Sequence, residues 1–448
     1  HGGLRYLEQK EFRLVREALA EREVLLAKAP HIIRPMRFIM PHRPHLRPAW
    51  LIRTGLFFYD HLGKRKKLSG SNNVYFKADS PLNAAITRGF EYSDCAVDDA
   101  RLVVLNAMHA REKGAEIMTR TRCVSARREG SLWVVDLENV NGQFQIKAKA
   151  LVNAAGPWVA KFIQQDLQLQ SPYGIRLIQG SHIIVPKLYD GEKAFIMQND
   201  DRRIVFAIPY LDHYTMIGTT DREYQGDPAQ VEITQDEIDY LLKVSNAHFK
   251  QQLSQADIIS TFSGVRPLCD DESDNPSAVT RDYTLALSQQ DDQAPLLSVF
   301  GGKLTTYRKL AESAMQQLKA FFPEMSGSWT ATEALPGGEN MESVEQLMRE
   351  IRAQVTDASE DLVKRWASAY GSRIWNILGE KSSVEQLGQH FGQGLYAREV
   401  DYLCTAEWVT TSQDVLWRRS KLGLSFTQKE SEALDAYLIV KTHSNEAA

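Results

Sequence analysis

The spacing of apolar side chains predicts two amphipathic helices in the first quarter of the chain. Residues 11–28 carry apolar side chains at helical intervals among charged ones, and Pro30 follows directly. Residues 98–113 also read as a helix and end at Gly114, a residue type that commonly terminates helices. We therefore expect a helix in each of these segments.

An alternating pattern replaces the helical one between residues 121 and 220. The turn sequences REGS and NVNGQ separate three predicted strands, and a fourth, apolar strand over residues 150–153 runs through Ala-Ala-Gly-Pro into a helix. Residues 175–220 contain further strand-like runs and predict a second sheet. A meander that returns to a buried strand and a glycine-marked helix suits an α/β domain better than an all-β sandwich.

The last third of the chain begins with one more strand and then becomes helical. The sequence PLLSVFGGKLTTYRKLAE reads as an apolar strand, a Gly-Gly turn and a long helix. Beyond residues 331–340 the pattern is helical and charged, with no strand signal. We place a domain boundary there, between an α/β region over 1–330, with its second sheet at about 170–285, and an all-helical C-terminal domain over 331–448.

Composition narrows the class of protein. The 448-residue chain is 43% hydrophobic and 25% charged, as in ordinary globular proteins. No apolar run approaches the roughly 18 residues of a membrane-spanning helix, and the N-terminus does not resemble a signal peptide. The four cysteines are widely spaced, which argues against a zinc site or a disulfide framework, so we expect no bound metal.

The net charge of −4 hides one strongly basic segment. Residues 28–67 contain ten Lys or Arg against a single acid, Asp60, next to a run of aromatic and aliphatic residues. That mixture is typical of a helix lying in a membrane interface, where each cation near an anionic surface contributes about 1 kcal/mol. A nucleic-acid partner is disfavoured because the rest of the chain is acidic. The alternative is a partly buried helix with solvated lysines.

Two glycine turns are candidate binding sites. Gly301 and Gly302 follow a predicted strand and precede Lys303 and Thr305, so the backbone can approach a ligand where a helix start attracts anions. The spacing is not that of a Walker A loop, which disfavours nucleotide hydrolysis. The small residues at 154–156 follow a strand in the same way. Close packing of helix against strand is the alternative for both turns.

Arginines and histidines supply candidate catalytic groups. Arg266, which precedes a proline, and Arg281, in a strand-like segment, are able to present planar donors to a phosphate or carboxylate. The alternative is a structural ion pair with one of three nearby aspartates, Asp270, Asp271 and Asp282. His182 and His1 are candidates for proton transfer, although a histidine in a strand is more often a core residue.

Eight segments together resemble one family. They are HGGLRYLE, ALAEREVLLAKAPH, FEYSDCAVDDARLV, LVNAAGPWV, GIRLIQGSHIIVP, IGTTDREYQGDP, SGVRPLCDDESDNPSAVTRDY and LLSVFGGKLTTYRKLAE. The chain resembles the respiratory, FAD-dependent glycerol-3-phosphate dehydrogenases, especially the aerobic, membrane-associated bacterial enzyme, over nearly its whole length. The resemblance implies a glutathione-reductase-like FAD domain, an antiparallel substrate-binding sheet and a helical C-terminal domain. It also implies oxidation of sn-glycerol 3-phosphate to dihydroxyacetone phosphate, with electrons passing through FAD to a quinone at the cytoplasmic face of the inner membrane.

The resemblance also implies roles for individual residues. Three arginines would hold the substrate phosphate and the reacting hydroxyl: Arg5, Arg266 and Arg281. Lys303 and Thr305 would lie where substrate meets flavin, and His182 is the candidate base. Cations suit these tasks because the substrate is a dianion and the flavin becomes anionic as it accepts hydride. The implied cofactor contacts are His1, Gly2, Gly3, Val124, Ala155, Gly156, Gly301, Gly302 and Leu304.

One departure from the family pattern concerns the N-terminal side. The family begins with a strand, a G-x-G-x-x-G turn and a helix that bind the FAD pyrophosphate, and this chain contains no such turn. We therefore expect a fragment with impaired FAD binding. Two alternatives stay open: an oxidase of glycerol 3-phosphate or amino acids that uses oxygen, and a membrane-surface protein without a cofactor. A homodimer is also left open.

Overall fold

The chain forms two compact units. The computed structural model describes residues 3–7, 11–63, 67–201, 203–269, 282–289 and 293–446, and the side chains of residues 5, 6 and 442–446 lie outside this description. The first unit consists of His1–Arg22, Met36–Asp94 and Arg120–Ser328. The second consists of Glu23–Pro35, Cys95–Thr119 and Trp329–Ala448. The domain boundary near residue 330 stays a prediction.

A large mixed sheet contains the strands that the sequence predicts over 175–220. Its order is β12-β8-β11-β10-β9-β1-β3-β2, with β13 paired along the other edge of β8. The strands are β1 (Ile33–Pro41), β2 (Asn72–Tyr75), β3 (Arg88–Val97), β8 (Ile175–Pro186), β9 (Ala194–Gln198), β10 (Ile204–Tyr210), β11 (Tyr214–Gly218), β12 (Arg222–Glu223) and β13 (Ser260–Cys269). Most pairs are antiparallel, and β1 with β9 is parallel.

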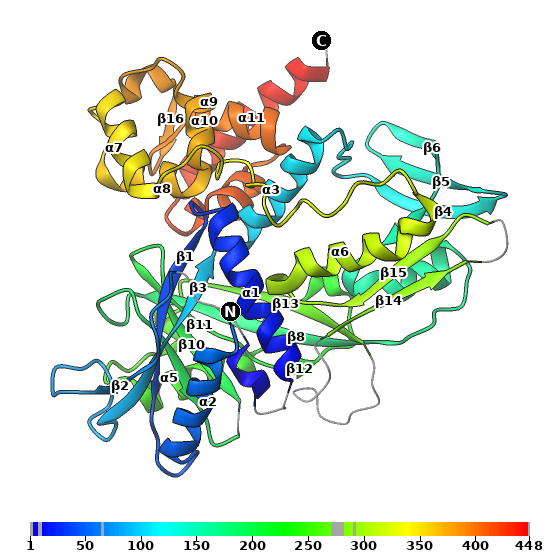
Figure 1. Cartoon of the computed structure of the whole chain (residues 1–448). Helices are drawn as coiled ribbons and strands as arrows, with labels where there is room; N and C mark the ends of the chain where they lie inside the picture. The colour runs from blue at the N-terminus through cyan, green and yellow to red at the C-terminus, as the bar shows by residue number, and fades with distance from the viewer. Residues whose placement is uncertain are drawn as a thin grey trace. The chain divides into compact units, whose positions relative to one another are not determined.

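Helix α5 (Gln235–His248) covers one face of this sheet (Figure 1). Its Leu241 and Val244 share a buried core with Ile183 and Val185 of β8. Because successive side chains of a strand point to opposite faces, the residues of β8 that alternate with these face away from α5. The His182 side chain therefore lies on the face of the sheet that points away from α5.

Two smaller sheets complete the first unit. The predicted meander is confirmed as β4 (Arg122–Glu129), β5 (Leu132–Asn139) and β6 (Gly142–Ala148). The strand order β14-β15-β7 joins Tyr283–Ser288, Leu296–Gly301 and Leu151–Asn153, with β15 and β7 parallel. Helix α6 (Tyr307–Leu318) lies along β14 and β15 through Ala314 and Leu318 (Figure 1).

Helix α1 (Phe12–Lys28) confirms the first predicted helix. Its Glu21 accepts a hydrogen bond from Arg308 Nε of α6 at 2.8 Å, and both side chains are buried. Short helical turns connect the longer elements: η1 (Leu4–Leu7), η2 (Gly156–Trp158), α4 (Val159–Lys161), η3 (Phe162–Asp166), η4 (Pro228–Gln230), η5 (Gln255–Asp257), η6 (Leu304–Thr306), η7 (Lys319–Phe321), η8 (Gly371–Arg373), η9 (Val384–Leu387), η10 (Asp414–Arg419) and η11 (Leu422–Leu424).

The second unit is mainly helical. Its helices are α3 (Asp99–Glu112), α7 (Val344–Gln354), α8 (Glu360–Tyr370), α9 (Ile374–Leu378), α10 (Ala397–Glu407) and α11 (Gln428–Glu446). Helix α3 confirms the helix predicted over 98–113, and the Asp98 side chain caps it by accepting from the Arg101 N–H. Trp366, Tyr370 and Ile351 belong to its buried core.

The expectation of a C-terminal domain without strands is wrong in one detail. A small hairpin joins β16 (His390–Gly392) to β17 (Leu395–Tyr396). Gly392, Gln393 and Gly394 adopt φ angles of 129°, 48° and 73°, which turn the chain within very few residues. Strands of two or three residues are too short to produce a recognisable alternation, so the pattern contained no signal for them.

Candidate functional site

Glycines open a space for Arg266 on the face of the large sheet opposite α5. The register of β8 and β13 places Gly180 across from Gly264 and Ile178 across from Arg266, so these residues share one face. A Cβ atom at Gly180 would lie 2.4 Å from Arg266 Nη2, which shows that the guanidinium packs on the glycine backbone. At Gly264 a Cβ would meet no atom of the described residues within 4 Å, so these residues leave space at this part of the sheet.

His182 lies next to Gly180 on the same face. Its strand neighbours are Gly218 on β11 and Phe262 on β13. The imidazole stacks on the Phe262 ring with centroids 4.6 Å apart, and a Cβ at Gly218 would lie 2.1 Å from His182 Cδ2. His182 is therefore held between a glycine and an aromatic ring, beside Arg266.

Burial, together with a smaller effect of the positive charge of Arg266, lowers the pKa of His182 to about 4. The Nδ1 atom is buried and has no hydrogen-bond partner in the part of the chain that the structure describes. The imidazole is therefore neutral around pH 7, and a neutral imidazole is able to accept a proton.

Two side chains of the loop after β11 hold Arg266. Its Nη1 donates to Asp221 Oδ1 at 2.6 Å and its Nη2 donates to Thr219 Oγ1 at 2.9 Å. The Asp221 side chain is 7% exposed and the Arg266 side chain is 31% exposed. Asp221 and Thr219 thus hold the guanidinium in place, and part of it stays exposed to solvent.

This ion pair differs from the alternatives that the sequence left open for Arg266. Asp282 pairs with Arg13 of α1 instead, and Asp270 and Asp271 lie outside the described residues. The actual partner, Asp221, lies 45 positions away in the chain. It comes near Arg266 because β11 and β13 flank the same strand, β8.

The Gly301-Gly302 turn lies beside the strand that carries Arg266. Both glycines have positive φ, 74° and 113°, a region that other residue types adopt only with strain. A Cβ at Gly301 would lie 2.9 Å from the Asp282 carbonyl oxygen and 3.7 Å from that of Pro267, the residue after Arg266. Lys303 directly precedes η6, and Leu304 and Thr305 belong to it. Lys303 and Thr305 are half-buried, and Leu304 is exposed.

The Ala155-Gly156 turn follows β7, the strand that pairs in parallel with β15. Gly156 has φ 56° and starts η2, and a Cβ there would meet nothing within 4 Å. The Asn153 side chain shapes the turn by accepting from the Ala155 N–H at 3.3 Å and donating to the Val159 carbonyl at 2.9 Å. Because η2 contacts both β13 and β15, the two glycine turns and the Arg266 strand lie together.

The other candidate residues fall in different places. Val124 lies in β4 at a β-bulge, on the separate three-stranded sheet. Gly3 is buried with φ 76°, and Arg5 belongs to η1 with its side chain outside the description. His1, Gly2 and Arg281 lie outside the described residues.

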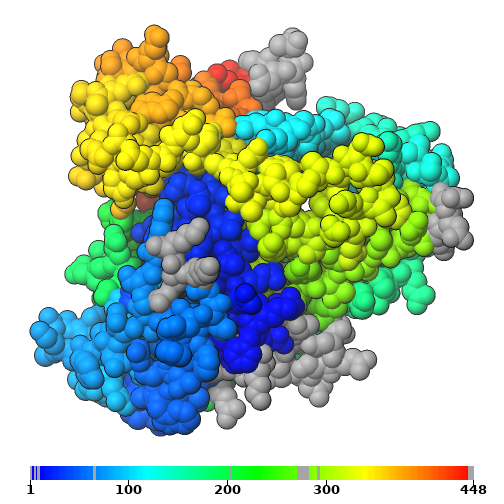
Figure 2. Space-filling model, viewed as in Figure 1, coloured from blue at the N-terminus to red at the C-terminus, as the bar shows by residue number. Residues whose placement is uncertain are grey.

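The basic segment of residues 28–67 contains α2 (Ala49–His61), which has two unlike apolar faces. Ile52, Leu56 and Tyr59 are buried. Trp50 and Phe57 are 69% and 57% exposed, and Leu51 and Phe58 are exposed as well. In the space-filling view this helix, drawn in blue, lies at the surface (Figure 2).

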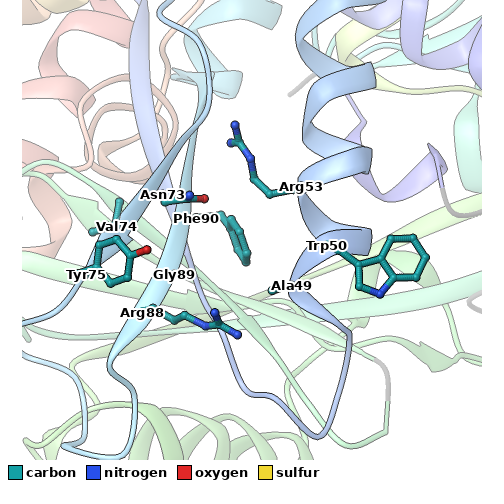
Figure 3. A pocket seen from close by; sticks show the side chains of 9 residues that line it. All are labelled: Ala49, Trp50, Arg53, Asn73, Val74, Tyr75, Arg88, Gly89 and Phe90. Atoms are coloured by element: carbon teal, nitrogen blue, oxygen red, sulfur yellow. The ribbon is translucent and has the colours of Figure 1, made fainter.

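A pocket of about 150 Å³ lies between α2 and strands β2 and β3 (Figure 3). Arg53 extends into it from α2 and Arg88 from β3, beside Asn73 and Tyr75 of β2 (Figure 3). Arg53 donates to the Ser71 carbonyl at 3.5 Å and Arg88 donates to His42 at 3.2 Å. Neither arginine pairs with a carboxylate among the residues described.

Two kinds of site are not found within the described ranges. No three His, Cys, Asp or Glu side chains are grouped so as to hold a metal ion. No described helix is long and apolar enough to cross a membrane.

Comparison with known proteins identifies the class. Residues 1–308 match the family described as FAD dependent oxidoreductase, and residues 328–442 match the C-terminal domain of alpha-glycerophosphate oxidase. The chain belongs to the FAD-dependent oxidoreductase family. The predicted FAD-domain fold, its helical C-terminal region and the family's dependence on FAD are thereby confirmed. The sheet predicted as antiparallel is mixed, because β1 and β9 pair in parallel.

Individual relatives point to one branch of this family. The chain is 67% identical over 440 residues to the glycerol-3-phosphate dehydrogenase of Pseudomonas tolaasii, covering 98% of this chain and 86% of the relative. It is 53% identical over 444 residues to the aerobic glycerol-3-phosphate dehydrogenase of Escherichia coli, covering 99% and 89%. The solved structure of glycerol-3-phosphate dehydrogenase from Bacillus halodurans, complexed with FAD, shares the fold with a TM-score of 0.71 at 23% identity, covering 94% and 84%.

Proposed function

We propose that the protein oxidises sn-glycerol 3-phosphate to dihydroxyacetone phosphate, transfers a hydride to FAD and passes the electrons to a membrane quinone. One observation carries the proposal: Arg266 and neutral His182 share one glycine-lined sheet face beside two glycine turns. A phosphate dianion requires cations, and loss of hydride from an alcohol requires a group that takes the hydroxyl proton. The identity to glycerol-3-phosphate dehydrogenases supports this substrate.

The glycine turns fit an FAD cofactor. No atom of the described residues would lie within 4 Å of a Cβ at Gly156, so a phosphate is able to approach this backbone closely. We propose that Ala155 and Gly156 bind the phosphates and that Gly301 and Gly302 contact the flavin ring and its chain. Further proposed contacts are His1, Gly2, Gly3, Val124 and Leu304. When bound, FAD supplies the hydride acceptor.

The chain's own side chains would then divide the work. Arg266, with Arg5 and Arg281, binds the phosphate and the reacting hydroxyl. Lys303 and Thr305 act where substrate and flavin meet, and the lysine charge stabilises negative charge that develops there. His182 accepts the hydroxyl proton, because its pKa of about 4 leaves it neutral at physiological pH.

An acceptor assay tests this function. The purified protein is supplied with FAD and with sn-glycerol 3-phosphate, unphosphorylated glycerol or an amino acid, and both reduction of a quinone analogue and formation of peroxide are measured. We expect quinone reduction with sn-glycerol 3-phosphate alone, and little peroxide. Peroxide without quinone reduction would instead establish an oxidase. If the protein showed no flavin absorbance band after incubation with FAD, it would instead be a membrane-surface protein without a cofactor.

We also propose that α2 associates with the anionic cytoplasmic face of the inner membrane. Its exposed Trp50, Leu51, Phe57 and Phe58 suit the headgroup boundary, and the pocket cations beside them suit lipid phosphates. This arrangement would bring the protein to the quinone without a spanning helix.

Vesicle flotation tests the membrane proposal. Replacing Phe57 and Phe58 with serine removes exposed apolar side chains, so we expect weaker binding to vesicles that contain anionic lipid. Val140→Ser is the matched control, because Val140 is 90% exposed and lies outside α2, between β5 and β6. Equal loss in the control and in the α2 variant would contradict the proposal.

A further inference from the structure

The polar groups on the α5 side of β8 form one network around a buried carboxylate, Glu237. Glu237 accepts hydrogen bonds from Gln179 Nε2 and Ser181 Oγ, each at 2.9 Å, and from Thr220 Oγ1 at 2.5 Å. It also accepts from the N–H and the hydroxyl of Thr234 at the start of α5, each at 3.0 Å. One side chain therefore links β8, the loop after β11 and α5.

The loop that Glu237 anchors is the loop that holds Arg266. Thr220 lies between Thr219 and Asp221, and its Oγ1 also accepts a backbone N–H of β8 at 2.9 Å. Arg266 donates to the residues on either side of Thr220. Because Thr220 is fixed to both β8 and α5, its neighbours offer acceptors at fixed positions.

These contacts leave the guanidinium one orientation. Its Nη2 lies against the backbone of Gly180, where no side chain could fit, and two acceptors lie at its two Nη atoms. Hydrogen bonds between arginine and carboxylate are directional and charge-assisted, so they set the direction of the planar group as well as its place. Arg266 nevertheless stays 31% exposed, on a sheet face that Gly264 leaves open.

We propose that Asp221 is a positioning residue for catalysis: anchored through Thr220 and Glu237, it orients the Arg266 guanidinium to receive the anionic substrate. This inference rests on the proposed function, since it takes Arg266 to contact glycerol 3-phosphate. Asp221 acts through Arg266 and does not itself touch the substrate. If Asp221 merely competed with the substrate phosphate for the arginine, its removal would strengthen binding, so the two accounts predict opposite signs.

A double-mutant cycle tests the proposal. Wild type, Asp221→Ala, Arg266→Gln and the double variant are prepared with FAD, and flavin reduction by sn-glycerol 3-phosphate is followed in single turnovers without oxygen. We expect Asp221→Ala to lower the second-order rate constant about 10- to 100-fold, as a misplaced binding group does. In the Arg266→Gln background the same change should cost less than about twofold, because nothing is left to orient.

Controls separate positioning from general damage. Asp221→Asn keeps an accepting oxygen, so its loss should be smaller than that of Asp221→Ala, and it carries the cycle if the alanine variant does not fold. Glu223→Gln is the matched control, because Glu223 is a nearby carboxylate on β12 that pairs with Arg176 at 3.2 Å. We expect that variant to react at the wild-type rate.

Two results would overturn the inference alone: a reactive wild type with Asp221→Ala equally fast or faster, or an equal loss in both backgrounds. A wild type whose bound flavin is not reduced by sn-glycerol 3-phosphate would instead refute the proposed function, and the inference with it.

Discussion

Arginine–carboxylate pairs occur in both units, and they differ in what surrounds them. In the second unit Arg101 pairs with Glu407, and the two side chains are 2% and 0% exposed. Glu399 accepts from Arg365 at 2.5 and 2.8 Å, from Trp366 Nε1 at 3.1 Å and from the Tyr370 hydroxyl at 2.6 Å. Protein groups supply all of these hydrogen bonds, and the carboxylates are almost completely buried, as is typical of structural pairs.

The Arg266–Asp221 pair of the first unit is built differently. Its carboxylate is buried, its guanidinium is partly exposed, and two glycines, Gly180 and Gly264, lie beside it on the same sheet face. An arginine in an ion pair therefore indicates a ligand site when its carboxylate partner is buried and its guanidinium stays partly exposed to solvent.

The largest expected effect is on stability, in the second unit. Glu399→Ala removes the buried carboxylate that Arg365, Trp366 and Tyr370 share, and breaking a buried pair costs about 3–5 kcal/mol. Urea unfolding should show this loss, while flavin reduction per folded molecule stays at the wild-type rate. A loss of catalysis without a loss of stability would contradict a purely structural role of the Arg365–Glu399 pair.

Arg266→Gln should show the reverse pattern. Removing a donor that stabilises developing or bound negative charge lowers kcat/KM about 10²- to 10³-fold. Because the Arg266 side chain is 31% exposed and glutamine keeps an N–H donor for the buried Asp221, we expect a smaller shift of the urea midpoint than for Glu399→Ala. The measurement is steady-state quinone-analogue reduction beside unfolding of the same preparation, and near wild-type kcat/KM would contradict a substrate role.

A buried histidine of the second unit, His31, makes the stability of the protein depend on pH. His31 of the second unit is 5% exposed, and neither ring nitrogen has a partner among described residues. Burial, with a smaller effect of Arg101, lowers its pKa to about 3. Between this value and the unfolded value near 6.5 the unfolded chain binds more protons, so stability falls as pH falls, by at most about 1.4 kcal/mol per pH unit.

His31→Asn should therefore flatten the decline of stability below about pH 6.5 and leave its pH dependence unchanged above. Urea unfolding over a pH series measures both ranges. Parallel curves for the variant and wild type would mean that His31 does not titrate as its burial implies.

Arg53 is a third kind of arginine, because it is exposed and its hydrogen bonds among the described residues go to Ser71 and not to a carboxylate. Arg53→Gln removes one cation near the lipid surface, so affinity for anionic vesicles should fall about fivefold, the equivalent of 1 kcal/mol. Activity without vesicles should not change. Unaltered vesicle affinity would place Arg53 outside the membrane contact.

Local patterns predicted much of this fold, and long-range pairing explains what they missed. The helices of residues 12–28 and 99–112 and the meander of 122–148 follow from periodicity and turn residues. Arg266 and His182 were identifiable as candidates because of their residue types. Asp221 was not, because its approach to Arg266 depends on two strands pairing with opposite edges of β8.

The sequence contains a local signal for one of the two roles of Glu237. The sequence TQDE at 234–237 is a capping box, in which a threonine and a glutamate three positions later bond reciprocally. It predicts the start of α5 correctly. That the same carboxylate also binds β8 and Thr220 depends on how the helix packs, which no local pattern contains.

We propose that the sheet face with Arg266 and His182 binds a phosphorylated alcohol for oxidation by FAD. Single-turnover reduction of the bound flavin, without oxygen, tests it most directly when sn-glycerol 3-phosphate is compared with glycerol. We expect rapid, saturable loss of the oxidised-flavin band with the phosphorylated substrate and almost none with glycerol. A fully loaded flavin that stays oxidised with both, or that is reduced equally by both, would contradict the account.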